Sequence, residues 1–155
     1  MSKSRGKKFE SEISKLLSIH PAVAYHYRPT DTPPSGHDRF TPRSPIDFYC
    51  YLQGGQGMVV ECKAIKGKSL PHSRFSDHQW LALDKCARAG VRTYVLVNHY
   101  GWPGRDGARG KAYAVEFGVL RALRARGTRK SWALGDIAVG GLGKVGGGWE
   151  WELQP

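Results

Sequence analysis

The stretch PIDFYCYLQGGQGMVVECKAIKG, residues 45–67, decides the fold of this 155-residue chain. It predicts two β-strands around the glycine-containing turn QGGQG, because aromatic and β-branched residues flank that turn. The second strand carries Glu61 and Lys63 two residues apart, and side chains at that spacing share one face of a strand. A carboxylate in that position, with another acidic residue on the neighbouring strand, is an arrangement that holds divalent cations.

Hydrophobic packing predicts how the two strands pair. With the five residues QGGQG as the turn, one face becomes fully apolar through the pairs Leu52–Met58, Cys50–Val60 and Phe48–Cys62. The other face then carries the pairs Tyr51–Val59, Tyr49–Glu61 and Asp47–Lys63. A register chosen only to bury apolar side chains therefore gathers Asp47, Glu61 and Lys63 on one polar surface.

The charge of the chain indicates the kind of partner it binds. Its 24 Lys and Arg against 13 Asp and Glu give a formal net charge of +11 and a pI near 9.8. Such an excess favours a densely negative partner, nucleic acid before an acidic membrane surface. No apolar run approaches the roughly 18 residues of a membrane span, and the N-terminus lacks the apolar segment of a signal peptide. We therefore expect a cytoplasmic, nucleoid-associated protein with no membrane partner.

The three cysteines, Cys50, Cys62 and Cys86, are odd in number and lack CxxC spacing. This argues against a disulfide framework and against a zinc ribbon. We expect them to be reduced residues buried in the core.

The periodicity around residues 45–67 predicts alternating helices and strands. Phe9, Ile13, Leu16 and Leu17 form the apolar stripe of a first helix that Pro21 ends. Ser76 and Gln79 have capping-box spacing at the start of a second helix, which Gly90 can end. Further strands are expected at residues 23–28, 93–99 and 111–117, a short basic helix at 118–126, and a last strand near the C-terminus. The segment between the second central strand and the second helix is expected to be a basic loop.

These elements predict a single domain over residues 1–155. Its class is α/β, with a mixed central sheet flanked by helices. A proline-rich segment at about 28–45 is expected to be a long exposed loop, and a glycine-rich segment spans about 140–155. The sequence contains no internal repeat.

Phosphodiester hydrolysis requires a cation, a water nucleophile and a group that orients or deprotonates this water. Asp47 and Glu61 can supply carboxylates to Mg²⁺, which keeps several waters in such sites, and the carbonyl of Cys62 can add a ligand. Lys63 can hold the water or neutralise the transition state. The alternative is a solvated pattern of cross-strand charges, which any sheet with one wet face produces.

Several short motifs in this order resemble the PD-(D/E)XK nuclease superfamily, and within it the Holliday junction resolvases of the RecU and Hjc types. They are RGKKFE, SPIDFY, ECKA, DHQWLAL and TRKSW. The resemblance implies a restriction-endonuclease-like fold and Mg²⁺-dependent cleavage of four-way DNA junctions by a homodimer. Whether Mn²⁺ can replace Mg²⁺ stays open. The resemblance also implies that Glu10 and Gln79 belong to the active site with Asp47, Glu61 and Lys63.

Each of these assignments has a structural alternative. Glu10 can be an ordinary surface glutamate, and Gln79 can serve only as the helix cap. His78 is expected to be exposed in the first turn of its helix. The chain departs from the RecU pattern at Pro45, where that family has a threonine, and Ser44 can offer a hydroxyl instead.

Basic residues outside this site are expected to neutralise DNA phosphates, which gives salt-dependent binding without sequence readout. One group precedes the first helix or lies in the loop after the second central strand: Arg5, Lys7, Lys8, Lys66, Lys68 and Arg74. A later group is Arg121, Arg124, Arg126, Arg129 and Lys130. The aromatic side chains near the site, Tyr49, Tyr51 and Trp80, either stack on bases or pack in the core, and packing is favoured.

Two other functions stay open. The same fold also serves nucleases that act on ordinary duplex, flaps or nicks. A non-catalytic, basic DNA-binding module is the second alternative.

Overall fold

The computed structural model describes residues 2–29, 44–103, 109–137, 140–145 and 148–153. Most of the proline-rich segment and part of the glycine-rich segment lie outside the described residues. In chain order the elements are α1 (Ser2–Ile19), β1 (Val23–Tyr27), β2 (Phe48–Leu52), β3 (Gly57–Ile65), β4 (Ser69–Pro71), the 3-10 helix η1 (His72–Arg74), α2 (Asp77–Arg88), β5 (Arg92–Pro103), β6 (Arg109–Glu116), α3 (Phe117–Arg126), β7 (Ser131–Ala133), α4 (Leu134–Ile137), β8 (Gly140–Val145) and β9 (Gly148–Glu150).

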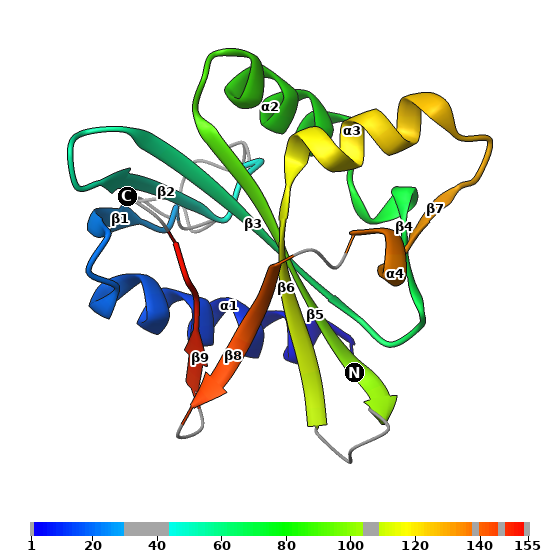
Figure 1. Cartoon of the computed structure of the whole chain (residues 1–155), viewed down its shortest axis with the longest axis horizontal. Helices are drawn as coiled ribbons and strands as arrows, with labels where there is room; N and C mark the ends of the chain where they lie inside the picture. Colours follow the sequence, from blue (N-terminus) through cyan, green and yellow to red (C-terminus); the bar gives the residue numbers. More distant parts are fainter. Residues whose placement is uncertain (1, 30–43, 104–108, 138–139, 146–147, 154–155) are drawn as a thin grey trace, which may run out of the picture.

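A mixed seven-stranded sheet runs through the molecule in the order β1-β2-β3-β5-β6-β8-β9 (Figure 1). Strands β3 and β5 pair in parallel, and the other neighbouring strands pair antiparallel. Helix α1 packs on one face of the sheet, and α2 and α3 pack on the other. The predicted α/β class with a mixed sheet and flanking helices is confirmed.

The apolar stripe of α1 is buried as predicted. Phe9, Ile13, Leu16 and Leu17 all pack into one core cluster. Their partners come from the α1-facing side of the sheet: Phe48, Cys50, Leu52, Met58, Val60 and Cys62. Helix α1 is therefore held in place by the same hairpin that the sequence singled out.

The predicted register of that hairpin is wrong by two residues. Phe48 pairs with Val60 and Cys50 with Met58, so Asp47 lies level with Glu61 rather than with Lys63. The turn is tighter than predicted, because Leu52 N–H donates to the carbonyl of Gln56 at 2.8 Å. Gly54 and Gly55 have φ near +90°, a conformation that glycine adopts without strain. Because side chains alternate with a period of two, the slip leaves every residue on its predicted face.

The second helix also forms as predicted. Ser76 Oγ accepts from the N–H of Gln79 at 3.1 Å, and the Gln79 side chain accepts from the N–H of Ser76 at 3.3 Å. Both halves of the capping box are thus present, and Gly90 follows the end of α2 with φ +85°. His78 is exposed, as expected. The predicted β1, β5, β6 and α3 are confirmed.

Several short elements were not predicted. The segment expected to be a basic loop contains β4 and η1, and β4 pairs antiparallel with β7 in a separate two-stranded sheet. Strand β8 was also missed, because its glycine-rich sequence carries little β-propensity. The pairing partners of both strands are far away in the sequence, so local pattern does not reveal them.

Cys50 and Cys62 are buried and Cys86 is half-buried, and all three are free thiols. Burial raises the pKa of Cys50 to about 12, which keeps this thiol protonated. Among the described residues no helix is long and apolar enough to cross a membrane.

Candidate active site

Glu61 lies in the middle of β3 and is almost completely buried, with 2% of its surface exposed. Its Oε1 accepts from Lys63 Nζ at 3.0 Å and from Gln79 Nε2 at 3.0 Å. Its Oε2 accepts from the backbone N–H of Asp47 at 3.1 Å. One carboxylate therefore joins β3, α2 and the segment just before β2.

Asp47 lies in the bend immediately before β2. Its Oδ2 accepts from the N–H of Cys62 at 2.8 Å. The Asp47 side chain therefore satisfies a backbone donor of β3 at a position just before β2 begins. Within a strand, the N–H and C=O of one residue point to the same side, so the Cys62 carbonyl is also directed toward the Asp47 side of β3. Asp47, Glu61 and the Cys62 carbonyl thus place oxygen atoms that could bind a metal near the N-terminal end of β2.

Gln79 has two roles at once. Its Oε1 accepts from the N–H of Ser76 and, at 3.2 Å, from Lys63 Nζ, while its Nε2 donates to Glu61. The cap orients the amide, because an oxygen directed at two donors leaves the NH₂ group facing the carboxylate. The structure confirms the cap, and the same amide also contacts Lys63 and Glu61.

Lys63 is also buried, with 8% of its surface exposed. Besides Glu61 and Gln79, its ammonium lies 4.7 Å from the centroid of the Phe75 ring. This burial contradicts the alternative of a solvated cross-strand pattern. The face that was expected to be a polar surface is in fact largely apolar, because Val59, Ile65, Val95 and Val97 pack beneath α2 and α3.

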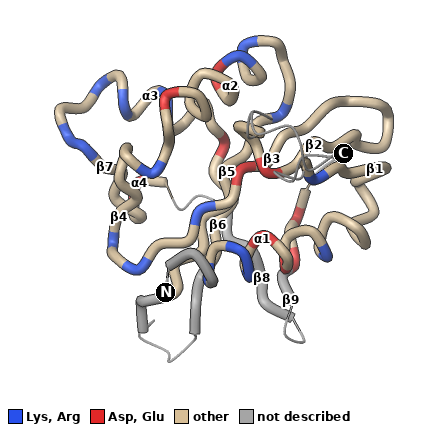
Figure 2. Tube along the Cα trace, turned by 180° about the vertical axis from the view of Figure 1, so that it is seen from behind, with Lys and Arg blue, Asp and Glu red and all other residues tan. Residues whose placement is uncertain are grey.

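Glu10 reaches the same region from α1. It lines a pocket of about 420 Å³ at the N-terminal end of β2, together with Lys7, Arg28, Ser44 and Asp47. Arg28 Nη2 donates to Glu10 Oε2 at 2.5 Å. Figure 2 shows the acidic positions of α1 and β3 close together near the middle of the molecule, seen from behind.

Sequence reasoning missed Arg28. Its guanidinium lies beside Glu10 and also 5.7 Å from the Phe48 ring. The only signal was its place at the end of a predicted strand, directly before the proline-rich loop. A single arginine in that position carries no periodicity, so only the fold shows that it belongs to the pocket.

The carboxylates of this site are hard to ionise. Burial, followed by the charge of Asp47, raises the pKa of Glu61 to about 8, although Lys63 lowers it in part. Burial also raises the pKa of Asp47, against the lowering effects of the Cys62 N–H and Lys63. The pKa of Glu10 is raised by burial and then by Asp47, and Arg28 opposes both. Clustered acids with raised pKa values are typical of functional sites.

The donor chemistry fits a hard divalent cation. In the described part of the chain no three His, Cys, Asp or Glu side chains form a complete metal cluster. Mg²⁺ does not require one, because it binds through one or two carboxylates and retains waters. A cation would also relieve the repulsion between Asp47 and Glu61 that contributes to the raised pKa of Glu61.

The predicted phosphate-binding residues lie in three places. Arg5, Lys7 and Lys8 are exposed on the first turns of α1, and Lys66 and Lys68 lie in the exposed turn after β3. Arg74 differs, because its Nη2 donates to the Ala64 carbonyl at 2.8 Å and so ties η1 to β3.

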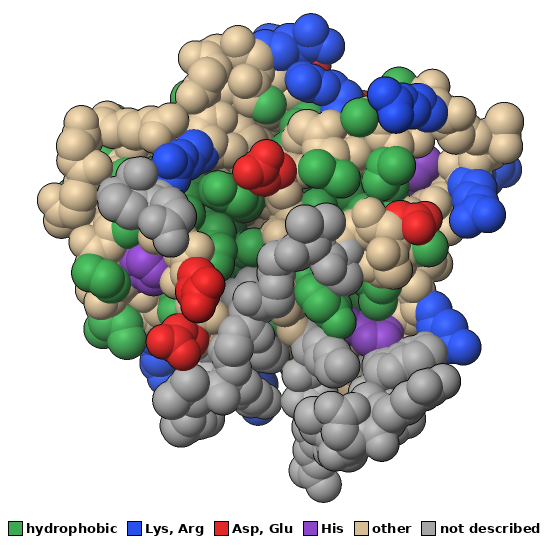
Figure 3. Space-filling view, in the orientation of Figure 1, with side chains coloured by type: hydrophobic (Ala, Val, Ile, Leu, Met, Phe, Trp, Pro, Cys, Tyr) green, Lys and Arg blue, Asp and Glu red, His purple; other side chains and the backbone are tan. Residues whose placement is uncertain are grey.

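The later basic group partly serves the fold. Arg121 Nη1 lies 2.8 Å from Asp84 of α2, and the Arg124 guanidinium lies 4.4 Å from the centroid of the Trp80 ring. Figure 3 shows Lys and Arg side chains along the rim formed by α2, α3 and the α3–β7 connection. Trp80 packs on Phe117 and Trp132, which agrees with the packing role favoured for it.

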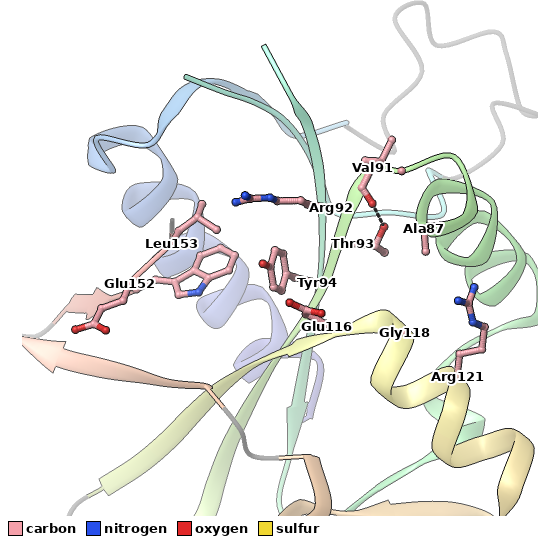
Figure 4. Close-up of a pocket in the computed structure, with 12 residues that line it drawn as sticks. Ala87, Val91, Arg92, Thr93, Tyr94, Glu116, Gly118, Arg121, Glu152 and Leu153 are labelled. Atoms are coloured by element: carbon pink, nitrogen blue, oxygen red, sulfur yellow. Dashed lines mark hydrogen bonds between the residues drawn. The ribbon is translucent and has the colours of Figure 1, made fainter. Parts of the chain in front are cut away.

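A larger pocket, of about 550 Å³, lies at the C-terminal end of α2, away from the end that carries Gln79 (Figure 4). Its lining includes Arg92 and Arg121 together with Glu116 and Glu152. Both signs of charge are therefore present in its lining, and none of the predicted catalytic residues lines it. The smaller pocket beside Glu10 and Asp47 is the one that joins carboxylates to the Glu61 and Lys63 network.

A mixed sheet with α1 on one face and α2 and α3 on the other is the arrangement of the restriction-endonuclease-like α/β fold. Among solved structures, the chain is similar to Hjc of Archaeoglobus fulgidus, a Holliday junction resolvase from an archaeal hyperthermophile. The TM-score is 0.51 at 18% sequence identity, over 88% of this chain and 93% of that chain. The predicted likeness to Hjc-type proteins is therefore confirmed for the fold.

No protein-family model matches the sequence, and a search of the curated proteins gives no match.

Proposed function

We propose that this chain is a metal-dependent endodeoxyribonuclease that resolves four-way DNA junctions in recombination and repair. The observation that carries the proposal is the hydrogen-bonded network of Asp47, Glu61, Lys63 and Gln79 at the N-terminal end of β2, in which Glu61 and Lys63 are buried. Burying Glu61 and Lys63 beside Asp47 costs desolvation free energy, which a role in fold stability alone does not explain. The fold shared with Hjc, which is a Holliday junction resolvase, favours DNA junctions as the substrate.

Asp47, Glu61 and the Cys62 carbonyl are the proposed ligands of Mg²⁺, which Mn²⁺ could replace. When bound, the cation would stabilise the negative charge that develops on the phosphoryl group and activate a water. The hard oxygen donors and the mutual repulsion of the two carboxylates support this assignment.

Lys63 is the proposed group that orients the attacking water and neutralises charge on the reacting phosphate. Its ammonium is 3.0 Å from Glu61 and is kept from bulk water, which strengthens its electrostatic effect. Gln79 holds this ammonium from the α2 side, and a helix cap in turn holds Gln79. Glu10 borders the pocket from α1 and Arg28 from the position just after β1, where Arg28 offers a cation to a DNA phosphate.

We further propose that the protein acts as a homodimer built from single nuclease domains. A four-way junction has twofold backbone symmetry, and a C2 dimer presents two identical sites that can nick opposing strands. The exposed Arg5, Lys7, Lys8, Lys66 and Lys68, together with the net charge of +11, support phosphate contacts that do not depend on sequence.

The test uses a labelled four-way junction and a linear duplex of the same arm sequence, each with Mg²⁺ or with a chelator. We expect paired nicks near the branch point, only on the junction and only with the cation. Equal cleavage of both substrates would make the protein a general nuclease instead. Tight binding of both without any cut, with Mg²⁺ or Mn²⁺, would leave a DNA-binding module and reject the enzyme.

A further inference from the structure

Strands β1 and β2 carry a cluster of tyrosines on one face of the sheet. Their antiparallel register sets Tyr25 opposite Tyr51 and Tyr27 opposite Tyr49. Side chains directly opposite one another in a sheet lie on the same face, about 5 Å apart. His26 and Cys50, which alternate with these residues, point to the other face toward α1.

Three of the four rings are open to solvent. Tyr25, Tyr27 and Tyr51 are 60%, 54% and 60% exposed. They are three of the five large hydrophobic side chains exposed among the described residues; the other two, Ile19 and Leu81, lie on helices. Scattered exposed rings need no explanation, but rings gathered on one face of two paired strands indicate a contact surface.

This face continues into the proposed active site. Asp47, Tyr49 and Tyr51 follow one another at alternate positions from the bend before β2 to near the end of that strand. At about 3.3 Å per strand residue, Tyr51 lies roughly 13 Å along the chain from Asp47. Bases of one DNA strand repeat about every 3.4 Å, so this span corresponds to roughly four nucleotides. Arg28 directly follows Tyr27 and lies on the other face, where it lines the pocket beside Glu10 and Asp47.

We infer that Tyr25, Tyr27 and Tyr51 form an aromatic platform that stacks on bases near the cleaved phosphate, where the branch point leaves bases unpaired. Every base offers a π-face, so such stacking tolerates any sequence, in keeping with a protein whose other DNA contacts are phosphates. The net charge of +11, and the position of Asp47 two residues before Tyr49 in this row of side chains, suit a DNA strand better than an apolar protein partner. The inference rests on the proposed function, since it names how the same site engages its substrate.

Binding to uncut DNA tests the platform, with chelator present to prevent cleavage. The variant Tyr25→Ala/Tyr51→Ala removes two rings, Tyr25→Phe/Tyr51→Phe retains them, and Ile19→Ala/Leu81→Ala removes exposed apolar groups elsewhere. Fluorescence anisotropy gives the Kd for a four-way junction and for a perfect duplex. The quenching of 2-aminopurine, placed at successive positions from the branch point, reports stacking directly.

For the double alanine variant we expect a Kd for the junction at least 10-fold weaker, with loss of the 2-aminopurine quenching. Duplex binding should change less than about 2-fold, and the salt dependence should keep its slope, because no phosphate contact is lost. The phenylalanine and control variants should bind as the wild type does. Thermal melting checks that each variant is folded.

Unchanged junction binding and quenching in the folded alanine variant would overturn the platform. A shift from dimer to monomer in sedimentation, with junction and duplex binding weakened alike, would also overturn it and identify the face as a contact between copies of the chain. Failure of the proposed function looks different, because the wild type itself would then not cut the junction with Mg²⁺. A wild type that cuts junctions, beside an alanine variant with unaltered binding, rejects only the platform.

Discussion

The two faces of the β2–β3 hairpin are built from alternate residues of the same strands, yet they have opposite properties. Toward α1, Phe48, Cys50, Met58 and Val60 form a continuous apolar surface. Toward α2, the surface begins with Val59 and then carries Glu61 and Lys63, both buried. The first face stabilises the fold, whereas the second carries the cost of buried charge at the proposed active site.

The difference also extends outward along β2. On the α1 side, Leu52 is still fully buried near the turn. On the other side, Tyr51 is exposed. The core cluster beneath α2 and α3 contains residues of β3, β5 and β6, but none of β1, the strand that pairs with β2 beside Tyr51. The helices therefore divide this face into a buried charged part and an open aromatic part.

The largest expected effect comes from removing the charge of the second face. Asp47→Asn and Glu61→Gln keep the shape of the side chains but lose the carboxylates, and we expect junction cleavage to fall at least about 1,000-fold. Junction binding should stay within about 3-fold. Single-turnover cleavage assays measure the first quantity and anisotropy the second. Asp136→Asn, an exposed residue of α4, is the control, and cleavage equal to wild type in both site variants would refute the assignment.

Truncation on the apolar face should act on stability instead. Phe48 is fully buried, and Phe48→Ala should lower the free energy of unfolding by about 3–5 kcal/mol, from lost burial and the cavity left behind. Tyr51→Ala, three residues along the same strand but exposed, should change it by less than about 0.5 kcal/mol. Urea denaturation compares the two. Similar losses in both would mean that the two faces do not differ as described.

The pH dependence of stability should come from the charged face. Glu61 has a pKa of about 8 when folded and about 4.5 when unfolded, so between these values the folded state binds more protons. Without divalent cation, the contribution of Glu61 to the free energy of unfolding should therefore be fully present below about pH 4.5. It should be lost as the pH rises to about 8, by on the order of a few kcal/mol. Asp47 and Glu10 shift in the same direction.

Glu61→Gln cannot ionise, so its urea denaturation midpoint should depend less steeply on pH over this range. Measurement in chelator across the range isolates the effect of the proton from that of a cation. A variant with the same slope as the wild type would show that Glu61 is already ionised in the folded state.

The smallest effect separates the two roles of Gln79. Ser76→Ala removes one half of the cap and should cost about 1 kcal/mol of stability while cleavage persists. Gln79→Ala should cost a similar amount and also slow cleavage, because Lys63 and Glu61 lose a shared partner. Thermal denaturation and initial cleavage rates measure both. Equal rates in the two variants would assign Gln79 to the cap alone.

Features that lie within one element could be predicted, because neighbours in sequence determine them. The stripe of α1, the capping box at Ser76 and the shared face of Glu61 and Lys63 follow from helical and strand periodicity. The prediction of site residues rested on these patterns and on the resemblance to resolvases. The register failed by two residues, because apolar matching alone does not reveal how tightly Gly54 and Gly55 can turn.

By itself, the sequence determined which residues share a face and where the longer helices and the central strands form, since both depend on local spacing. Only the tertiary structure decided that Glu61 and Lys63 are buried, that Arg28 joins Glu10, and that the tyrosines of β1 and β2 meet on an open face. These outcomes depend on which helix covers which strand and on pairings between distant segments. Burial and long-range pairing are properties of the packed chain, so spacing along the sequence cannot specify them.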